Sequence, residues 1–301
     1  MTDNPKSKTK LGIGILTYAL NSPDTDYEKL AYLMALSYIA TNKHQLKLCV
    51  IVNDRKNCRP ELYDVYDFVL DKPDLTKFKK SQDEAIHPMH YEAHLFRITP
   101  FAETIKVECD MLFTSDISNW IKHMRQYPIC FTNQVYNFNN EPADDSYYRK
   151  YIHQNLLPNV YNGFMYVRFL RTTAMFFKCV DQIFRNWDYN IKKFRLWEKW
   201  KPSTDFAMAM ACHYMNDLTF GINPTGIPGF IHAKPYITHK SKKHWHEEMN
   251  WSIVNPSTVI VNGVKASWPI HYYDKNFATD EILKKYEVFL QNKNFNKHFL
   301  F

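Results

Sequence analysis

The sequence predicts an α/β fold in which one domain has a mostly parallel central sheet flanked by helices. Two short apolar runs, Leu11–Tyr18 and Leu46–Val52, have the length of buried strands. Between them lies Tyr27–Ala40, whose apolar residues recur at helical spacing. A strand, a helix and a strand at this spacing form a unit that places its two strands in parallel. The 301 residues are enough for a large core, and no internal repeat divides them.

The remaining elements follow in order. The apolar residues of Tyr27–Ala40 share one face, which predicts an amphipathic helix. Pro100 is expected to stop a helix over Tyr91–Ile98. The other expected segments are strand Val65–Leu70, loop Asp71–Pro88, strand Thr104–Val107, helix Ser118–Arg125, strand Ile129–Thr132, loop Asn137–Tyr148, strand Tyr161–Val167, helix Thr172–Asn190, helix Ser203–Met215 with Ser203 as N-cap, and helix Ala278–Leu290.

Composition narrows the classes of function. Seven glycines and no GxGxxG or GxxxxGK[ST] match argue against a glycine-rich phosphate loop. The absence of a CxxC pair among six cysteines argues against a zinc site. Cys49, Cys109 and Cys179 lie in apolar runs, which is typical of reduced, buried thiols in a cytosolic protein. The polar N-terminus lacks a signal-peptide core, and no run of about 18 apolar residues exists, so we expect a cytoplasmic protein without a membrane partner.

The main candidate site lies in Glu103–Trp120. Its buried strand, Thr104–Val107, ends in two acids one residue apart, Glu108 and Asp110. In open α/β sheets ligands bind at the edge where such strands end. Two hard oxygen ligands there suit Mg²⁺ or Mn²⁺ shared with substrate phosphates. Acid-x-acid triplets are also common as solvated loop ends or helix caps, so the surrounding segments decide between these interpretations.

Four segments resemble the glycosyltransferases of family eight and their GT-A-fold relatives. His94–Phe113 (HLFRITPFAETIKVECDMLF) resembles their Arg-bearing helix, Pro turn and strand ending in Asp-x-Asp. Tyr161–Phe169 (YNGFMYVRF) resembles the Asn-(Ala/Ser)-Gly-(Val/Phe)-Met strand beside the donor sugar, and Ser203–Asp205 stands where the family has Asp-Gln-Asp. Pro269–Lys275 (PIHYYDK) resembles the late His segment. The expected division is a polar tail at 1–10, a GT-A domain at 11–275 and a C-terminal helical extension at 276–301.

The resemblance implies a metal-dependent transfer of sugar from a nucleoside-diphosphate sugar, with UDP-sugar favoured, to a hydroxyl with retention at the anomeric carbon. Asp110 and His271, with Glu108, would bind the metal, Mn²⁺ or Mg²⁺. Glu108 departs from the family's Asp, and its longer side chain has the reach for the ribose or a water instead. Asp205 would orient a sugar hydroxyl or stabilise the oxocarbenium-like transition state; its structural alternative is helix capping.

A further group would contact the donor. It comprises Thr17, Tyr18, Asn53, Arg97, Glu108, Asn162, Gly163 and Lys275. Thr17, Tyr18 and Asn53 end the first two strands, where they would hold uracil and ribose, although such positions are often turn formers. Gly163 would permit close approach of the backbone to the sugar. The late Gly of the family's His segment is missing before Lys275. The alternative for Arg97 is a surface ion pair.

The charge of the chain and its aromatic residues among cations bear on the identity of the acceptor. The net charge of +7 and the segments Arg195–Lys201, Lys242–Trp245 and Tyr147–Lys150, in which aromatic residues lie among cations, suit nucleic acid. The amino-acid sequence of the strand and the acids that follow it, Glu103–Phe113, also resembles that of phage-encoded transferases. Some of these enzymes glycosylate hydroxylated pyrimidines in their own DNA. We therefore expect modified duplex DNA as acceptor, in the host cytoplasm, with a cell-surface glycan or protein as the alternative.

Two other classes compete with a transferase. One is a non-catalytic nucleic-acid-binding module on a degenerate transferase fold. The other is a metal-dependent nuclease or phosphatase, which needs more converging acids than this chain offers. The segment His239–Glu248, with three Lys and three His, is interpreted as a basic loop that closes over the diphosphate, touches an acceptor backbone or is simply solvated.

Overall fold

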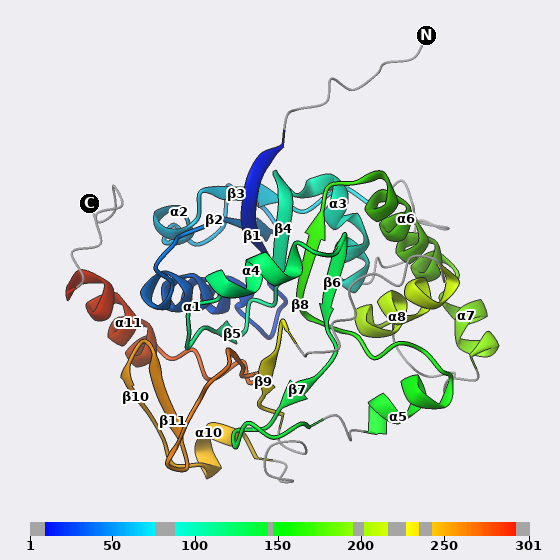
Figure 1. Ribbon diagram of the computed structural model, residues 1–301. Helices are drawn as coiled ribbons and strands as arrows, with labels where there is room; N and C mark the ends of the chain where they lie inside the picture. Colours follow the sequence, from blue (N-terminus) through cyan, green and yellow to red (C-terminus); the bar gives the residue numbers. More distant parts are fainter. Residues whose placement is uncertain are drawn as a thin grey trace.

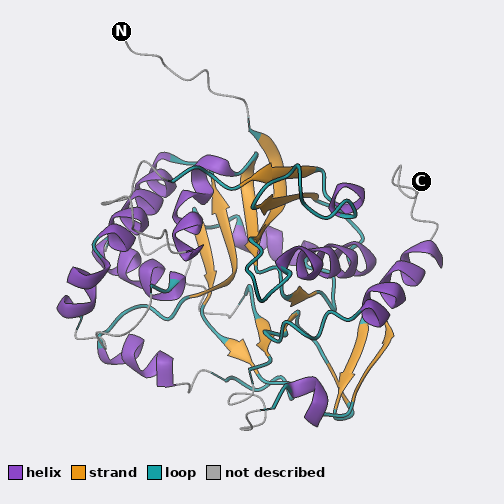
Figure 2. Cartoon of the chain, turned by 180° about the vertical axis from the view of Figure 1, so that it is seen from behind, coloured by secondary structure: helices purple, strands orange, loops and turns teal. Residues whose placement is uncertain are grey.

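The computed structural model describes residues 10–75, 88–143, 147–194, 202–215, 227–234 and 243–292. A six-stranded sheet lies at the centre with helices on both faces (Figures 1 and 2). Its strands, in spatial order, are β3 (Phe68–Asp71), β2 (Lys47–Val52), β1 (Leu11–Ala19), β4 (Phe101–Val107), β8 (Tyr161–Arg168) and β6 (Ile129–Thr132). The predicted α/β fold with a mostly parallel central sheet in a single domain is confirmed.

The strand order places a topological switch point at the centre of the sheet. From β1 the chain moves outward through β2 and β3, and then returns to the other side of β1 as β4. These four strands are parallel, whereas β8 runs antiparallel to both β4 and β6. Adjacent parallel strands whose connections leave in opposite directions open a gap at their carboxyl ends, where ligands bind. The fold therefore predicts a binding site beyond the ends of β1 and β4.

Helices cover the sheet on both faces, which accounts for two hydrophobic cores. One core joins Ile15 and Ile105 of the sheet to α1 (Tyr27–Thr41) and α11 (Asp280–Asn292). The other joins Leu16 and Met165 to α6 (Arg171–Arg185) and α8 (Thr204–Tyr214). Successive strand residues point to opposite faces, so neighbouring positions such as Ile15 and Leu16 serve different cores.

Smaller elements surround this frame. The remaining helical segments are α2 (Leu62–Val65), the 3₁₀ segment η2 (Pro88–His94), α3 (Leu95–Ile98), α4 (Ser118–Met124), α5 (Tyr147–Gln154), α7 (Trp187–Lys193) and α10 (Trp245–Glu248). The remaining strands are β5 (Met111–Leu112), β7 (Val135–Tyr136), β9 (Phe230–His232), β10 (Trp251–Asn255), β11 (Thr258–Val261), β12 (Val264–Lys265) and β13 (Ile270–His271). A four-stranded sheet in the order β5-β13-β9-β7 lies beyond the end of β4, and β10-β11-β12 form an antiparallel sheet.

Four expectations about secondary structure need correction. The helix at Tyr27 is not amphipathic, because α11 covers its outer face and nearly all its residues are buried. The third strand begins only at Phe68, since α2 occupies Leu62–Val65. The predicted helix over Tyr91–Ile98 is 3₁₀ up to His94.

The fourth correction concerns the long helix, which breaks at Asn186 into α6 and α7. Ser203 is the N-cap residue of α8, but its side chain makes no capping hydrogen bond. Met208 and Met210 of this helix are buried in the core.

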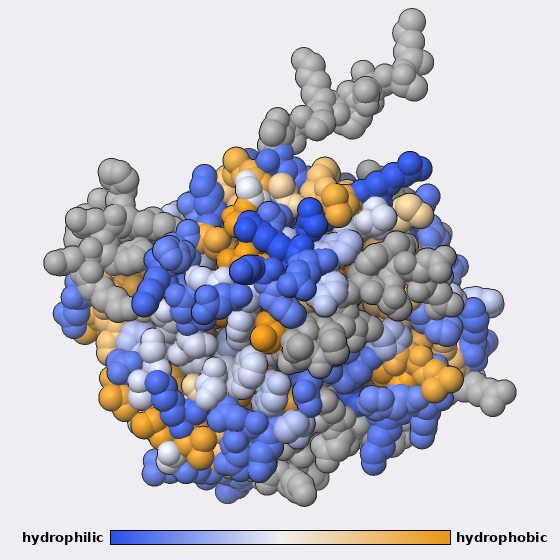
Figure 3. All heavy atoms as spheres, viewed as in Figure 1, coloured by the Kyte–Doolittle hydropathy of each residue, from blue (hydrophilic) through white to orange (hydrophobic). Residues whose placement is uncertain are grey.

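The expectation of buried thiols holds for Cys49 and Cys109 but is wrong for Cys179. All six cysteines are free, and Cys49 and Cys109 are buried, whereas Cys179 is partly exposed. In the part of the chain that the structure describes, no helix combines the length and the apolar character needed to cross a bilayer. The face shown in Figure 3 is mainly hydrophilic, with hydrophobic residues in separate groups.

Candidate active site

Asp110 lies just beyond β4 and contacts two basic side chains, His271 and Lys275. His271 Nε2 is 3.1 Å from Asp110 Oδ1, and Lys275 Nζ donates a short hydrogen bond to Oδ2. The pairing of β13 with β5 places His271 opposite Met111, which fixes the imidazole beside the acid. Burial by itself would raise the pKa of Asp110, but the charges of His271 and Lys275 hold that pKa well below its usual value. Asp110 is therefore an ionised carboxylate in a buried position.

The turn after β13 aims two side chains at the same acid. Tyr273, between His271 and Lys275, has a φ of 57°, a left-handed conformation that is rare for a bulky residue. Strained backbone of this kind persists where the surroundings impose it, and it clusters at functional sites. The Tyr273 ring lies 5.5 Å from Lys275 Nζ. His271 and Lys275, on either side of Tyr273, each contact one oxygen of Asp110.

Glu108 belongs to a different group, centred on a buried lysine. Lys106 Nζ lies 2.7 Å from Glu108 Oε1, 2.8 Å from Glu92 Oε2 and 3.1 Å from the carbonyl oxygen of Asn162. Lys106 is 1% exposed. Burial opposes its charge, but Glu108 and Glu92 outweigh burial and raise the pKa of Lys106. Burial, opposed by Lys106 and reinforced by Glu108, raises the pKa of Glu92 to about 7.

Asp205 is fixed by Arg149 and by the backbone of β8. Asp205 Oδ2 accepts a hydrogen bond from Arg149 Nη2, and Oδ1 accepts one from the backbone N–H of Asn162 at 2.8 Å. The Arg149 guanidinium also donates to the Val160 carbonyl at 2.6 Å and lies 3.3 Å over the Tyr161 ring. Although Asp205 is in the first turn of α8, these bonds leave the helix, so they are not a cap.

Lys234 interacts electrostatically with both Asp110 and Asp205. It follows β9 and is partly buried, with Nζ 4.7 Å from the Tyr273 ring. Burial lowers its pKa, the negative charges of Asp205 and Asp110 oppose that shift, and Arg149 adds to it. Lys234 therefore lies within the electric field of both acids. Two residues before Lys234, the His232 ring stacks on that of His271 at 5.0 Å between centroids.

Several predicted donor-site atoms are buried without a hydrogen-bond partner among the residues that the structure describes. They are Thr17 Oγ1, Asn53 Oδ1 and Asn162 Oδ1, and Nδ1 of the predicted metal ligand His271 is in the same situation. A buried polar atom left unsatisfied costs about 1–3 kcal/mol. Thr17 lies at the end of β1 and Asn53 follows β2, so these atoms are near the carboxyl edge of the sheet. Unsatisfied atoms gathered at a switch point are typical of a site that a polar ligand completes.

The other predicted residues are placed as follows. The Tyr18 hydroxyl donates to the Tyr91 carbonyl at 3.3 Å. A Cβ on Gly163 would lie 3.0 Å from Phe230, so the backbone here is closely covered. Arg97 is exposed on α3, which precedes β4 and lies at the opposite end of that strand from Glu108 (Figure 1). The structure therefore groups Asp110, His271 and Lys275, links Glu108 and Asp205 through Asn162, and leaves Arg97 apart.

The basic segments do not all have the form that the sequence suggested. Trp245 is 1% exposed and packs on Phe277, so it cannot stack on a base. Nitrogen atoms of His244 and His246 lie 3.0 and 2.7 Å from Asp274 Oδ2. Arg195–Lys201, His239–Lys242 and the larger part of the loop Asp71–Pro88 lie outside the described residues.

Sequence reasoning missed Glu92, Lys106, Arg149 and Lys234. A usable signal existed for Lys106, because a lysine two residues before Glu108 in a buried strand must face the same side and needs counter-charges. No signal of this kind marked Glu92 or Arg149, whose partners are distant in sequence.

Comparisons with known proteins identify the fold. The chain matches no protein-family model and no curated protein sequence. Among solved structures, an active-site mutant of LgtC has a TM-score of 0.50 at 10% identity, covering 93% of this chain and 95% of that one. The galactosyltransferase LgtC with donor and acceptor sugar analogs has a TM-score of 0.49 at 12% identity, covering 92% and 94%. Mouse xyloside xylosyltransferase 1 has a TM-score of 0.46 at 11% identity, covering 69% and 84%. The chain has a GT-A-type fold.

Proposed function

We propose that the chain is a metal-dependent glycosyltransferase that moves a sugar from a nucleoside-diphosphate sugar, with UDP-sugar favoured, to an acceptor hydroxyl. The observation that carries this proposal is the grouping of Asp110, His271 and Lys275 beyond the end of β4. It lies at the switch point of a GT-A-type sheet, beside predicted donor-site atoms that are buried and unsatisfied. Two solved structures similar to this chain are of LgtC, one of them with donor and acceptor sugar analogs.

Asp110 and His271 have the spacing that a shared divalent ion requires. Adjacent ligands of an octahedral ion with bonds of about 2.1 Å lie roughly 3 Å apart, and Asp110 Oδ1 and His271 Nε2 are 3.1 Å apart. A carboxylate with an imidazole suits Mn²⁺ better than Mg²⁺. When bound, the ion would neutralise charge on the donor diphosphate. We propose that Glu108 contacts a sugar or ribose hydroxyl instead, since Lys106 and Asn162 already hold it.

Three basic residues of the site, Lys275, Lys234 and Arg149, have different proposed roles. Lys275, on the second oxygen of Asp110, and Lys234, near the same acid, are placed to balance the charge of a leaving diphosphate. Arg149 and the Asn162 N–H orient Asp205, whose side chain is 23% exposed and retains lone pairs for a substrate hydroxyl. The proposal includes retention at the anomeric carbon, which the proton NMR coupling of the product's anomeric hydrogen would test.

The acceptor proposed from the sequence, hydroxylated pyrimidine in duplex DNA, now rests on fewer residues. The net charge of +7 still favours a polyanion. Trp245 is buried, however, and Arg149 is buried and paired with Asp205. DNA binding that falls steeply with salt would support a DNA acceptor over a glycan or protein. Binding that does not respond to salt, or no binding, would leave the glycan or protein acceptor.

The competing classes fit less well. A two-metal nuclease or phosphatase needs several acids around its ions. Of the three acids predicted for the sugar site, Glu108 is bound by Lys106 and Asp205 by Arg149, so Asp110 alone among these three lies next to a metal-type ligand. A non-catalytic binding module would show no donor-dependent activity. A donor-dependent activity that is lost in Asp110→Ala would therefore exclude this class.

Thermal unfolding with nucleotides tests the proposal. A ligand that binds only the folded state at 100 times its Kd stabilises that state by about 2.7 kcal/mol. We expect UDP with Mn²⁺ to raise the Tm of the wild type by several degrees and to leave Asp110→Asn unchanged. The control Asp188→Asn, at an exposed position on α7, should keep the shift. If no nucleoside diphosphate shifts the wild type, with or without metal, the transferase proposal is wrong.

A further inference from the structure

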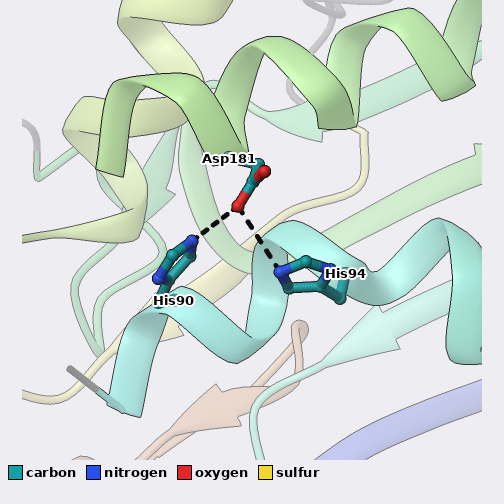
Figure 4. A group of neighbouring side chains, drawn as sticks. All are labelled: His90, His94 and Asp181. Atoms are coloured by element: carbon teal, nitrogen blue, oxygen red, sulfur yellow. Dashed lines mark hydrogen bonds and ion pairs between the residues drawn. The ribbon is translucent and has the colours of Figure 1, made fainter. Parts of the chain in front are cut away.

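A second group of metal-type ligands lies on η2 and α6, apart from Asp110 (Figure 4). His90 Nε2 is 2.7 Å from Asp181 Oδ1, and His94 Nε2 is 3.5 Å from the same oxygen. The ligand atoms of the three residues all lie within 4.8 Å of one another. In the described part of the chain this is the one trio of His, Cys, Asp or Glu side chains so arranged.

The local structure explains why these side chains converge. His90 and His94 are four residues apart on η2 and point toward α6, from which Asp181 projects (Figure 4). Phe184, three residues after Asp181 on α6, stacks against the His90 ring at 5.2 Å between centroids. Arg185, one helical turn after Asp181, donates hydrogen bonds of 3.0 and 3.1 Å to its carboxylate. The acid and one imidazole are therefore held in place by neighbours that are not ligands themselves.

The donor set matches the chemistry of zinc. Two imidazole nitrogens and one carboxylate oxygen are ordinary Zn²⁺ ligands at about 2.0–2.2 Å. Ligands in a tetrahedron with such bonds lie roughly 3.4 Å apart, close to the 3.5 Å between His94 and Asp181. The 2.7 Å contact of His90 would have to open by several tenths of an ångström. Arg185 would supply the outer hydrogen bonds that commonly orient a carboxylate ligand.

We propose that His90, His94 and Asp181 bind one Zn²⁺ ion, with water as the fourth ligand, and that the ion fastens η2 to α6. The missing CxxC motif does not exclude such a site, because its ligands are imidazoles and a carboxylate. The three side chains are 5–16% exposed, so the ion would be largely shielded from solvent.

The ion has a consequence for the candidate active site. The segment η2 also carries Tyr91, whose carbonyl accepts the Tyr18 hydrogen bond, and Glu92, which contacts Lys106. Tyr18 and Lys106 lie on β1 and β4, beside the switch point. Fastening His90 and His94 to α6 therefore positions the two residues between them. The zinc ion is a structural support for this wall of the site and takes no part in sugar transfer.

Metal content and affinity test the proposal. Full-length wild type, stripped with a chelator, is titrated with ZnCl₂ against a chromophoric competitor, and bound metal is counted by mass spectrometry. The test variants are His90→Gln and Asp181→Asn, and the controls are His153→Gln, an exposed helical histidine, and Asp110→Asn. We expect one Zn²⁺ per chain in the wild type and both controls. Each test variant should lose affinity by more than the roughly 10- to 100-fold that removal of an outer-shell group costs.

Co²⁺ provides a second readout that does not depend on stability. The loaded wild type should show the visible absorption of four-coordinate cobalt with nitrogen ligands, and His90→Gln should not, while circular dichroism shows both folded. The proposal is overturned if the wild type binds zinc no better than His90→Gln, in which case the trio is a hydrogen-bonded network. It is also overturned if Asp110→Asn removes the zinc. The nucleotide-dependent Tm shift is a separate measurement, so either proposal can fail alone.

Discussion

Replacing Lys106 with methionine should destabilise the protein in a strongly pH-dependent way. The side chain is 1% exposed and bridges Glu92 at 2.8 Å and Glu108 at 2.7 Å. Methionine keeps most of the volume but leaves the buried Glu92 without a cation. Removing one partner of a buried ion pair costs about 3–5 kcal/mol. Glu108 is 29% exposed, so solvent offsets part of its loss and the lower end, about 3 kcal/mol, is expected.

The sign of the pH effect follows from Glu92. Its pKa in the folded protein is raised from 4.5 to about 7, so below pH 4.5 the carboxyl is neutral in both states, and its favourable contribution is lost as pH rises toward 7. Without Lys106 that pKa rises further. The destabilisation by Lys106→Met should therefore be largest at pH 8 and clearly smaller at pH 5.

Urea unfolding at pH 5 and pH 8 measures both quantities. Lys265→Met, at an exposed position on β12, is the matched control and should change stability by less than about 0.5 kcal/mol. Adding Glu92→Gln to Lys106→Met should recover part of the loss at pH 8, because the uncompensated buried charge is then gone. A cost below about 1 kcal/mol at pH 8, or an equal cost at both pH values, would refute the reasoning.

Three further predictions concern single residues. Glu92→Gln alone should abolish the fall in wild-type stability between pH 4.5 and about 7, since the titrating carboxyl with the raised pKa is removed; urea midpoints across that range would show it. Gly14→Ala should cost about 1–3 kcal/mol, because its Cβ would lie 2.4 Å from the Phe101 ring. Gly12→Ala, with nothing within 4 Å, is its control, and equal Tm values for the two variants would contradict the packing argument. Arg149→Met should lower stability by about 2 kcal/mol, because it leaves the carbonyl of Val160 and a 23% exposed Asp205 without their donor, and an unchanged Tm would count against it.

The first half of the central sheet could be predicted from the sequence because its signals are local. The runs at β1 and β2 are apolar, short and separated by one helix, and the structure confirms both strands in parallel. The helix between them was wrongly interpreted as amphipathic because its burial depends on α11, more than 200 residues away. Its polar Ser37 donates to the Met34 carbonyl within the helix, so it is compatible with burial.

The candidate site likewise contains residues that local sequence signals predicted and residues that they did not. Asp110 was visible as an acid at the end of a buried strand, and the resemblance to a family supplied His271 and Lys275. The structure shows these three in contact, which leaves their function as a proposal. Lys106 had a local signal, since it lies two residues before Glu108 in a buried strand, but its second partner, Glu92, had none. Arg149 could not be assigned either, because its partner Asp205 is brought near only by the fold. Histidines at spacing i, i+4 were visible at positions 90 and 94, but nothing in the sequence linked them to Asp181, 87 residues beyond His94.

The segment η2 contributes to two groups of charged residues, the His90–His94–Asp181 group and the group around Lys106. Within η2, His90 and His94 turn toward Asp181 on α6, whereas Glu92, halfway between them, turns toward Lys106 on β4. A 3₁₀ segment of seven residues has poor hydrogen-bond geometry and little stability of its own. These side-chain contacts on both sides therefore help to hold it in position, together with its packing against α6 and α8. An acid with a pKa near 7 beside a candidate sugar site is sensitive to small displacements of the lysine that balances it, since Coulomb energy in a buried pair changes steeply with distance. Rigid attachment of η2 on the side away from the sheet is the physical condition under which Glu92 and Lys106 keep a fixed separation.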